Sequence, residues 1–123
     1  KNISFEYMLD VLPELKIDYA DISSVISNLI DNAIEATEKT ENAYIQLKIT
    51  THGSYVDIFV KNTYDGIINT AEQQSILATT KNDTFLHGYG TKIIKEIAEK
   101  HDGNYSWKES GDFFITNVLL KYN

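Results

Sequence analysis

The chain has 123 residues, of which 42% are hydrophobic and 24% charged, with 1 proline and no cysteine. This length and composition are typical of a single globular domain over residues 1–123, and they exclude disulfide frameworks, cysteine zinc sites and cysteine nucleophiles. The formal net charge of −7 argues against binding to nucleic acid, where lysine and arginine neutralise phosphates. No apolar stretch approaches the roughly 20 residues of a membrane-spanning helix, so we expect no direct membrane insertion by this domain.

The first part of the chain predicts a strand followed by a helix. Residues 3–12 alternate between polar and apolar side chains, which predicts a half-buried strand that ends at Pro13. Apolar residues then recur at spacings of three and four, which predicts an amphipathic helix with Asp21 as its N-cap and its end near Glu38.

The rest of the chain predicts a hairpin, an irregular segment, a second helix and a second hairpin. So long an irregular segment is typical of a lid or a binding loop. The assigned residues are strands 43–49 and 56–60, the irregular segment 62–87 with a short helix within 71–77, a helix from the Gly88–Gly90 run to Gly103, and strands 105–109 and 113–120. This order predicts a two-layer α+β sandwich, with a mixed, mostly antiparallel five-stranded sheet and the helices on one face.

The polar face of the first predicted helix carries amides and carboxylates. Residues three and four apart share a helix face, so one stripe consists of Asn28, Asp31, Asn32 and Glu35. Asparagine is a weak helix former, so this face is not optimised for helix stability. Its oxygens suit a magnesium ion whose remaining ligands come from phosphates, although a solvated polar face has the same pattern.

A glycine-rich run, His87–Lys92, leads into the second predicted helix. Gly88 and Gly90 allow a tight turn and a close approach of ligand to main chain, and a helix N-terminus attracts anions. Lys92, in the predicted first turn, is favoured there when an anion compensates its charge. Lys81 is a second candidate counter-charge. An ordinary turn and a solvated lysine are the alternatives.

Between these motifs, strand 56–60 runs into a turn at Asn62–Gly66. An amide or carboxylate oxygen there can accept a hydrogen bond from the exocyclic amino group of adenine. The alternative is a simple strand terminus.

Together the three motifs resemble the nucleotide site of the ATPase superfamily that groups gyrase, Hsp90, histidine kinases and MutL. Residues 27–36, Ser-Asn-Leu-Ile-Asp-Asn-Ala-Ile-Glu-Ala, resemble its N box, Asn62–Gly66 its G1 box and Gly88–Gly90 its G2 box. The resemblance covers nearly the whole chain and implies the Bergerat-type sandwich of that superfamily. It is nearest to sensor histidine kinases of the peptide-quorum-sensing subfamily.

The resemblance implies a role for each motif. Asn32 would coordinate magnesium, with Asn28 supporting the same ion, and Asn62 would contact adenine, with Asp65 as the second choice. Residues 78–87 would form an ATP lid. The implied ATP-binding residues are Asn28, Asn32, Asn62, Asp65, Gly66, Lys81, Gly88, Tyr89, Gly90, Thr91 and Lys92.

The chain departs from the superfamily pattern in ways that bear on its chemistry. Tyr64 replaces a glycine of the G1 box, which predicts a shallower pocket and lower nucleotide affinity. Glu35 stands where orthodox sensor kinases often have a basic residue, and Thr91 where the G2 box has leucine. Asn28 stands where hydrolysing members have a glutamate base. An amide cannot act as a base, so we expect slow hydrolysis and transfer of the γ-phosphoryl to another acceptor.

That acceptor is not in this chain, since His52, His87 and His101 all follow the N box. The resemblance therefore implies a catalytic domain excised from a longer sensor kinase and not autonomously active. It would bind Mg-ATP and phosphorylate a histidine on upstream dimerisation helices. The full-length protein would be a homodimer in the cell membrane, with this domain in the cytoplasm and a response regulator as partner in two-component signalling. The alternatives are a degenerate nucleotide-binding or protein-interaction module and an anti-sigma-type serine kinase.

Overall fold

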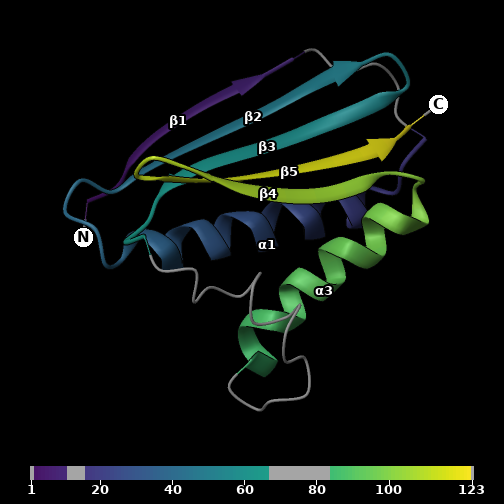
Figure 1. Ribbon diagram of the computed structural model, residues 1–123. Coiled ribbons are helices and arrows are strands. Elements are labelled where there is room, and N and C mark those ends of the chain that lie inside the picture. Colours follow the sequence, from purple (N-terminus) through teal and green to yellow (C-terminus); the bar gives the residue numbers. More distant parts are fainter. Residues whose placement is uncertain (1, 11–15, 67–83, 123) are drawn as a thin grey trace.

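The computed structural model describes residues 2–10, 16–66 and 84–122 (Figure 1). The short helix expected within residues 71–77, most of the expected lid and Lys81 lie outside the described residues. The described elements are β1 (Ser4–Leu9), α1 (Tyr19–Thr37), β2 (Tyr44–His52), β3 (Tyr55–Thr63), α3 (Thr84–Lys100), β4 (Asn104–Ser110) and β5 (Phe113–Lys121).

The strands form one five-stranded sheet in the order β1-β2-β3-β5-β4. β1 pairs with β2 in parallel, and the other three pairs are antiparallel. Both described helices lie on the same face of this sheet (Figure 1). The predicted α+β sandwich is therefore confirmed, with α1 as the crossover between the parallel strands.

The core lies between the inner face of the sheet and the two helices. Strands β2, β3 and β5 bury every second residue, as the alternating sequence predicts. The helices contribute the apolar stripes read from the sequence: Val25, Leu29 and Ala33 from α1, and Ile94, Ile97 and Ala98 from α3. No helix among the described residues has both the length and the apolar character needed to cross a bilayer.

The first strand differs from its prediction. β1 was expected to be half-buried, but all of its residues are exposed, including Phe5, Tyr7 and Leu9 on the inner face. The reason is that α1 packs mainly against β3 and α3, so it leaves the edge of the sheet uncovered. The alternating pattern identified the strand correctly and its burial wrongly.

The start of α1 also differs from its prediction. The N-cap is Asp18, whose side chain accepts a hydrogen bond from the Ala20 amide at 3.0 Å, and not Asp21. Asp21 lies in the first turn and reaches the far end of α3. Its Oδ2 lies 2.9 Å from Lys100 Nζ and 2.8 Å from His101 Nε2. We call this group of three side chains the Asp21 clasp.

The end of α3 is a Schellman turn. The Gly103 amide bonds the Ala98 carbonyl at 2.8 Å, and the Asp102 amide bonds that of Glu99 at 3.2 Å. Asp102, with a φ of 51°, adopts the left-handed conformation that such turns usually give to glycine. Gly103 is required for a different reason, because a Cβ there would lie 1.7 Å from the Leu119 carbonyl oxygen.

Candidate functional site

The site is built on a close contact between the two helices. Asn28 Nδ2 donates to the Ser24 carbonyl at 2.7 Å, which fixes the amide on the polar face of α1. Its Oδ1 faces Gly90 of α3 so closely that a Cβ at Gly90 would lie only 2.5 Å from it. A glycine at position 90 therefore lets the N box and the G2 box meet.

A buried hydroxyl belongs to the residue that follows Gly90 in α3. Thr91 is 3% exposed, and its Oγ1 has no hydrogen-bond partner among the described residues. Buried polar groups are nearly always hydrogen-bonded, and leaving one unsatisfied costs about 1–3 kcal/mol. The Asn28 oxygen thus lies against the backbone at Gly90, and the next residue of α3 carries this unsatisfied hydroxyl.

The remaining N-box residues continue along the same helix. Asn32 follows Asn28 by one turn and is half-buried, whereas Asp31 and Glu35 are exposed. In the described part of the chain, no three His, Asp or Glu side chains gather into a metal site. The amide oxygens of Asn28 and Asn32 are a different, neutral donor set, and hard oxygens of this kind fit a magnesium ion that keeps waters and phosphates as its other ligands.

The structure changes the interpretation of the glycine run. Helix α3 begins at Thr84, so Gly88, Tyr89 and Gly90 lie inside the helix, whereas the sequence predicted that they precede it. Glycine costs about 1 kcal/mol relative to alanine within a helix, which tertiary packing can offset. Lys92 is exposed and lies beyond the first turn, so the argument that its position calls for an anion does not hold.

The G1 segment lies at the end of β3, beside the end of α1. Thr63 Oγ1 connects the two, since it lies 3.2 Å from Thr40 Oγ1 and accepts from the Tyr44 amide at 3.1 Å. Asn62 is 2% exposed on the inner face, and its Nδ2 donates to the Thr63 carbonyl at 3.0 Å. Of the two candidate adenine contacts, Asn62 is therefore buried and Asp65 exposed.

Gly66 is the one glycine of the G1 pattern that this chain keeps, and the backbone explains why. Its φ of +85° lies in the left-handed region, where a side chain would be strained. Tyr64 replaces the other G1 glycine, and its φ does not lie in the left-handed region. Tyrosine is tolerated there, and its side chain turns into the core.

Tyr64 belongs to an aromatic cluster that the sequence patterns did not predict. Its ring lies 5.6 Å from that of Phe114, on which Trp107 stacks at 5.3 Å. Its hydroxyl donates to Glu109, and burial together with this carboxylate raises the pKa of Tyr64 to about 12. The alternation of strand 113–120 was the available signal, since it places Phe114 on the inner face opposite Asn62.

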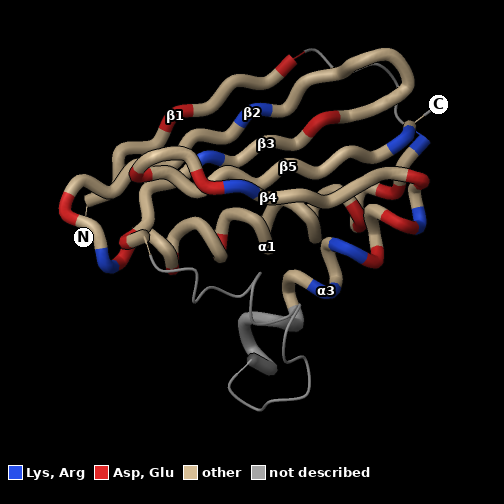
Figure 2. The backbone as a smooth tube through the Cα atoms, in the orientation of Figure 1, with Lys and Arg blue, Asp and Glu red and all other residues tan. Residues whose placement is uncertain are grey.

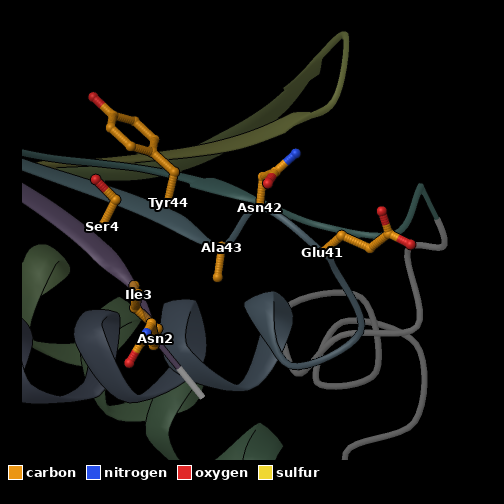
Figure 3. Close-up of a pocket in the computed structure, with 7 residues that line it drawn as sticks. All are labelled: Asn2, Ile3, Ser4, Glu41, Asn42, Ala43 and Tyr44. Atoms are coloured by element: carbon orange, nitrogen blue, oxygen red, sulfur yellow. The ribbon is translucent and has the colours of Figure 1, made fainter.

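A separate shallow hollow of about 570 Å³ opens at the start of β1 (Figure 3). None of the predicted site residues lines it. Its lining consists of Asn2, Ile3, Ser4, Glu41, Asn42, Ala43 and Tyr44.

Comparisons with known proteins agree with this geometry. The sequence profile of the GHKL domain matches residues 17–121. Sensor protein TdiS of Thauera aromatica is 31% identical over an alignment of 106 residues, and the match covers 81% of this chain and 19% of that protein. An NtrY-like relative from Rickettsia bellii is 30% identical over an alignment of 104 residues, and the match covers 81% of this chain and 16% of the relative. The chain thus spans less than a fifth of these relatives.

Solved structures share the fold. The catalytic domain of histidine kinase ThkA superposes with a TM-score of 0.76 at 24% identity, over 98% of this chain and 79% of that one. Full-length ShkA, solved in complex with AMPPNP, superposes with a TM-score of 0.76 at 19% identity, over 98% of this chain and 26% of ShkA. The chain therefore belongs to the GHKL domain family and has the fold of histidine kinase catalytic domains.

Proposed function

We propose that this chain binds Mg-ATP and acts as the phosphoryl-donating domain of a sensor histidine kinase. The observation that carries the proposal is the contact of Asn28 with Gly90, which Thr91 follows in α3 with a buried hydroxyl that has no partner among the described residues. Two motifs that are 62 positions apart in sequence are thereby brought into contact. Similarity to sensor proteins supports the assignment.

Each part of the junction has a proposed role. Asn32 holds the magnesium ion through its amide oxygen, and Asn28 supports the same ion from the preceding turn. When bound, magnesium neutralises the charge of the triphosphate. Gly90 lets the Asn28 amide lie against α3, and Thr91 Oγ1 donates to a phosphate the hydrogen bond that it lacks within the described chain.

The proposed chemistry is transfer rather than hydrolysis. Asn28 is neutral and cannot remove a proton from water, so the junction supplies no general base. Phosphoryl transfer depends mainly on positioning and charge stabilisation, so a domain of this kind can serve as a donor to a nucleophile supplied elsewhere. Asn62 is the preferred adenine contact, because it is buried on the inner face of β3, near the end of α1. Asp65 is the alternative.

The finer assignments concern the whole protein. We infer a longer chain in which upstream dimerisation helices carry the phosphorylated histidine, a homodimer is formed, and a response regulator receives the phosphoryl group. We further propose a membrane location and membership of the peptide-quorum-sensing subfamily, which rest on the resemblance of the N box and of residues 87–97 to that subfamily.

Titration calorimetry with Mg-ADP tests nucleotide binding directly. We expect saturable heat that is lost with EDTA and reduced at least tenfold in affinity by Asn32→Ala. Asn104→Ala is the matched control, because Asn104 is an exposed asparagine on the far edge strand and should bind as the wild type does. No heat at millimolar nucleotide, or equal binding by both variants, would contradict the proposal.

Transfer is tested in the longer protein with radiolabelled ATP. The expected product is an acid-labile phosphohistidine that disappears in the Asn32→Ala variant. An acid-stable phosphoserine on a separate protein would point instead to a serine kinase.

A further inference from the structure

The free edge of β1 carries most of the exposed large hydrophobic side chains of the described residues. We use this name for residues Ser4–Leu9, on the side of the strand away from β2. The exposed fractions are 49% for Phe5, 68% for Tyr7, 56% for Met8 and 56% for Leu9. Large apolar side chains therefore surround a strand edge with no neighbour among the described residues.

The hydrogen bonds of β1 show which residues have main-chain groups facing outward. The amides of Ser4 and Asp10 donate to β2, to the Ala43 and Ile49 carbonyls at 2.9 Å each. In a parallel pair, alternate residues bond the same neighbour, so the even-numbered residues face β2. The N–H and C=O groups of Phe5, Tyr7 and Leu9 therefore point away from the sheet.

The free edge lacks the usual protection against pairing. Edge strands are commonly blocked by proline, by lysine or by a bulge. The opposite edge strand, β4, carries Lys108 and Glu109, whereas β1 carries only Glu6 within its length (Figure 2). The side chain of Glu6 points to the outer face, where it is paired in register with Gln46, so it does not block the edge.

We propose that the free edge of β1 pairs antiparallel with the same edge of a second copy, about a two-fold axis at Tyr7. This register places Phe5 opposite Leu9 of the second copy and Tyr7 opposite itself. All three outward-facing residues of each strand then become hydrogen-bonded, and their side chains form one apolar row. The two sheets become one continuous ten-stranded sheet, since each contributes five strands.

Charge selects this register over its neighbours. Centring on Tyr7 places Glu6 opposite the apolar Met8 of the second copy. Centring on Glu6 would set two carboxylates directly opposite each other, which is unfavourable. Centring on Met8 would place Phe5 opposite position 11, beyond the end of β1. The proposal does not depend on nucleotide binding.

A six-residue strand buries little surface, so the pairing is expected to be weak and dependent on concentration. Sedimentation equilibrium from about 10 μM to 1 mM covers the range of weak complexes. We expect the mass to rise from 14.0 kDa towards twice that value. A chain that stays monomeric throughout would overturn the proposal.

Tyr7→Pro is the sharpest variant, because it removes an outward-facing N–H without removing a hydrogen bond to β2. We expect at least tenfold weaker association with an unchanged far-ultraviolet circular dichroism spectrum. Tyr19→Ser is the matched control, since Tyr19 is 84% exposed on α1, and it should associate as the wild type does. If Tyr7→Pro fails to fold, Tyr7→Lys replaces it, because two ammonium groups would then meet at the axis. Association that is unaffected by the folded variant would contradict the proposal.

Disulfide formation tests the register. The chain has no cysteine, so a single introduced one can only pair with itself. The two Tyr7 Cα atoms would be about 5.5 Å apart, within disulfide range, whereas the two Phe5 Cα atoms would be separated by about 14 Å. Tyr7→Cys should therefore cross-link on mild oxidation and Phe5→Cys should not. Equal cross-linking of both variants would refute the register. If the cysteine at position 7 is protected from thiol labelling only in a longer form of the protein that is monomeric, an upstream segment covers this edge instead of a second copy.

Discussion

Replacing Gly90 with alanine is expected to leave the free energy of unfolding nearly unchanged, although alanine is the better helix former. Alanine stabilises a helix interior by about 1 kcal/mol relative to glycine. The new methyl group, however, would lie 2.5 Å from Asn28 Oδ1 and 3.3 Å from Asn28 Cγ. The Asn28 side chain must then move and give up its 2.7 Å hydrogen bond to the Ser24 carbonyl. Losing that bond costs about 1 kcal/mol, which offsets the gain.

A double-mutant cycle separates the two effects. In an Asn28→Ala background the methyl group meets no obstacle, so Gly90→Ala should stabilise the domain by about 1 kcal/mol. The expected coupling between the two positions is therefore about 1 kcal/mol. Urea unfolding of the four proteins measures it, and Lys95→Gly compared with Lys95→Ala calibrates the intrinsic preference at an exposed position of the same helix.

Equal stabilisation of both backgrounds by Gly90→Ala would refute the steric contact. That outcome would mean that Asn28 does not pack against position 90. If the contact holds, the displaced amide should also weaken Mg-ADP binding by at least tenfold, far more than the small change in stability implies.

Three further substitutions test the packing and titration of the fold. Gly103→Ala should destabilise the domain by about 3 kcal/mol, because its Cβ would lie 1.7 Å from the rigid Leu119 carbonyl oxygen. Tyr64→Phe should remove a step near pH 12 from the ultraviolet titration of tyrosine. Because the pKa of Tyr64 is raised to about 12 by folding, the stability it contributes is present below pH 10 and lost between about pH 10 and 12. Asp21→Asn should flatten the loss of stability in acid. Hydrogen bonds from His101 and Lys100 lower the pKa of Asp21, so its contribution is present above its unfolded pKa, near 3.8, and lost as the pH falls below that value.

Each of these predictions has a control. Gly53→Ala tests the effect of φ alone, because its φ is 61° and a Cβ there meets nothing within 4 Å, so the expected cost is only about 1–2 kcal/mol. Equal losses at positions 53 and 103 would contradict the steric argument. A Tyr64→Phe titration identical to that of the wild type would place the high pKa on another tyrosine. An Asp21→Asn profile parallel to the wild type down to pH 2 would show that the Asp21 clasp does not titrate with folding.

Sequence periodicity predicted the layers of the fold because every second strand residue and every third or fourth helix residue meets the core. It did not predict how far the core extends. Phe5 and Tyr7 alternate with polar residues as strongly as any buried pair, yet no described helix covers them. Whether a helix lies over a strand is decided by helix packing, which is not encoded within the strand itself.

At the site, too, contacts between residues distant in sequence override local sequence patterns. Gly88 and Gly90 are helix breakers by propensity, so the sequence predicted that they precede the helix, but α3 includes them. The contact that favours glycine at position 90 comes from Asn28, which is distant in sequence. Asp18 and Asp21 are equally good N-caps by residue type, and the long-range partners of Asp21 were not visible in its neighbours.

The Asp21 clasp has a mechanical consequence. It holds the last residues of α3 to the start of α1, while Gly90 lies ten residues before Lys100 on the same helix. At 1.5 Å per residue, that separation makes an arm of about 15 Å. Any change in the space between Asn28 and Gly90 would therefore rotate α3 about its C-terminal end, which the Asp21 clasp holds. The displacement would be largest at the beginning of the helix.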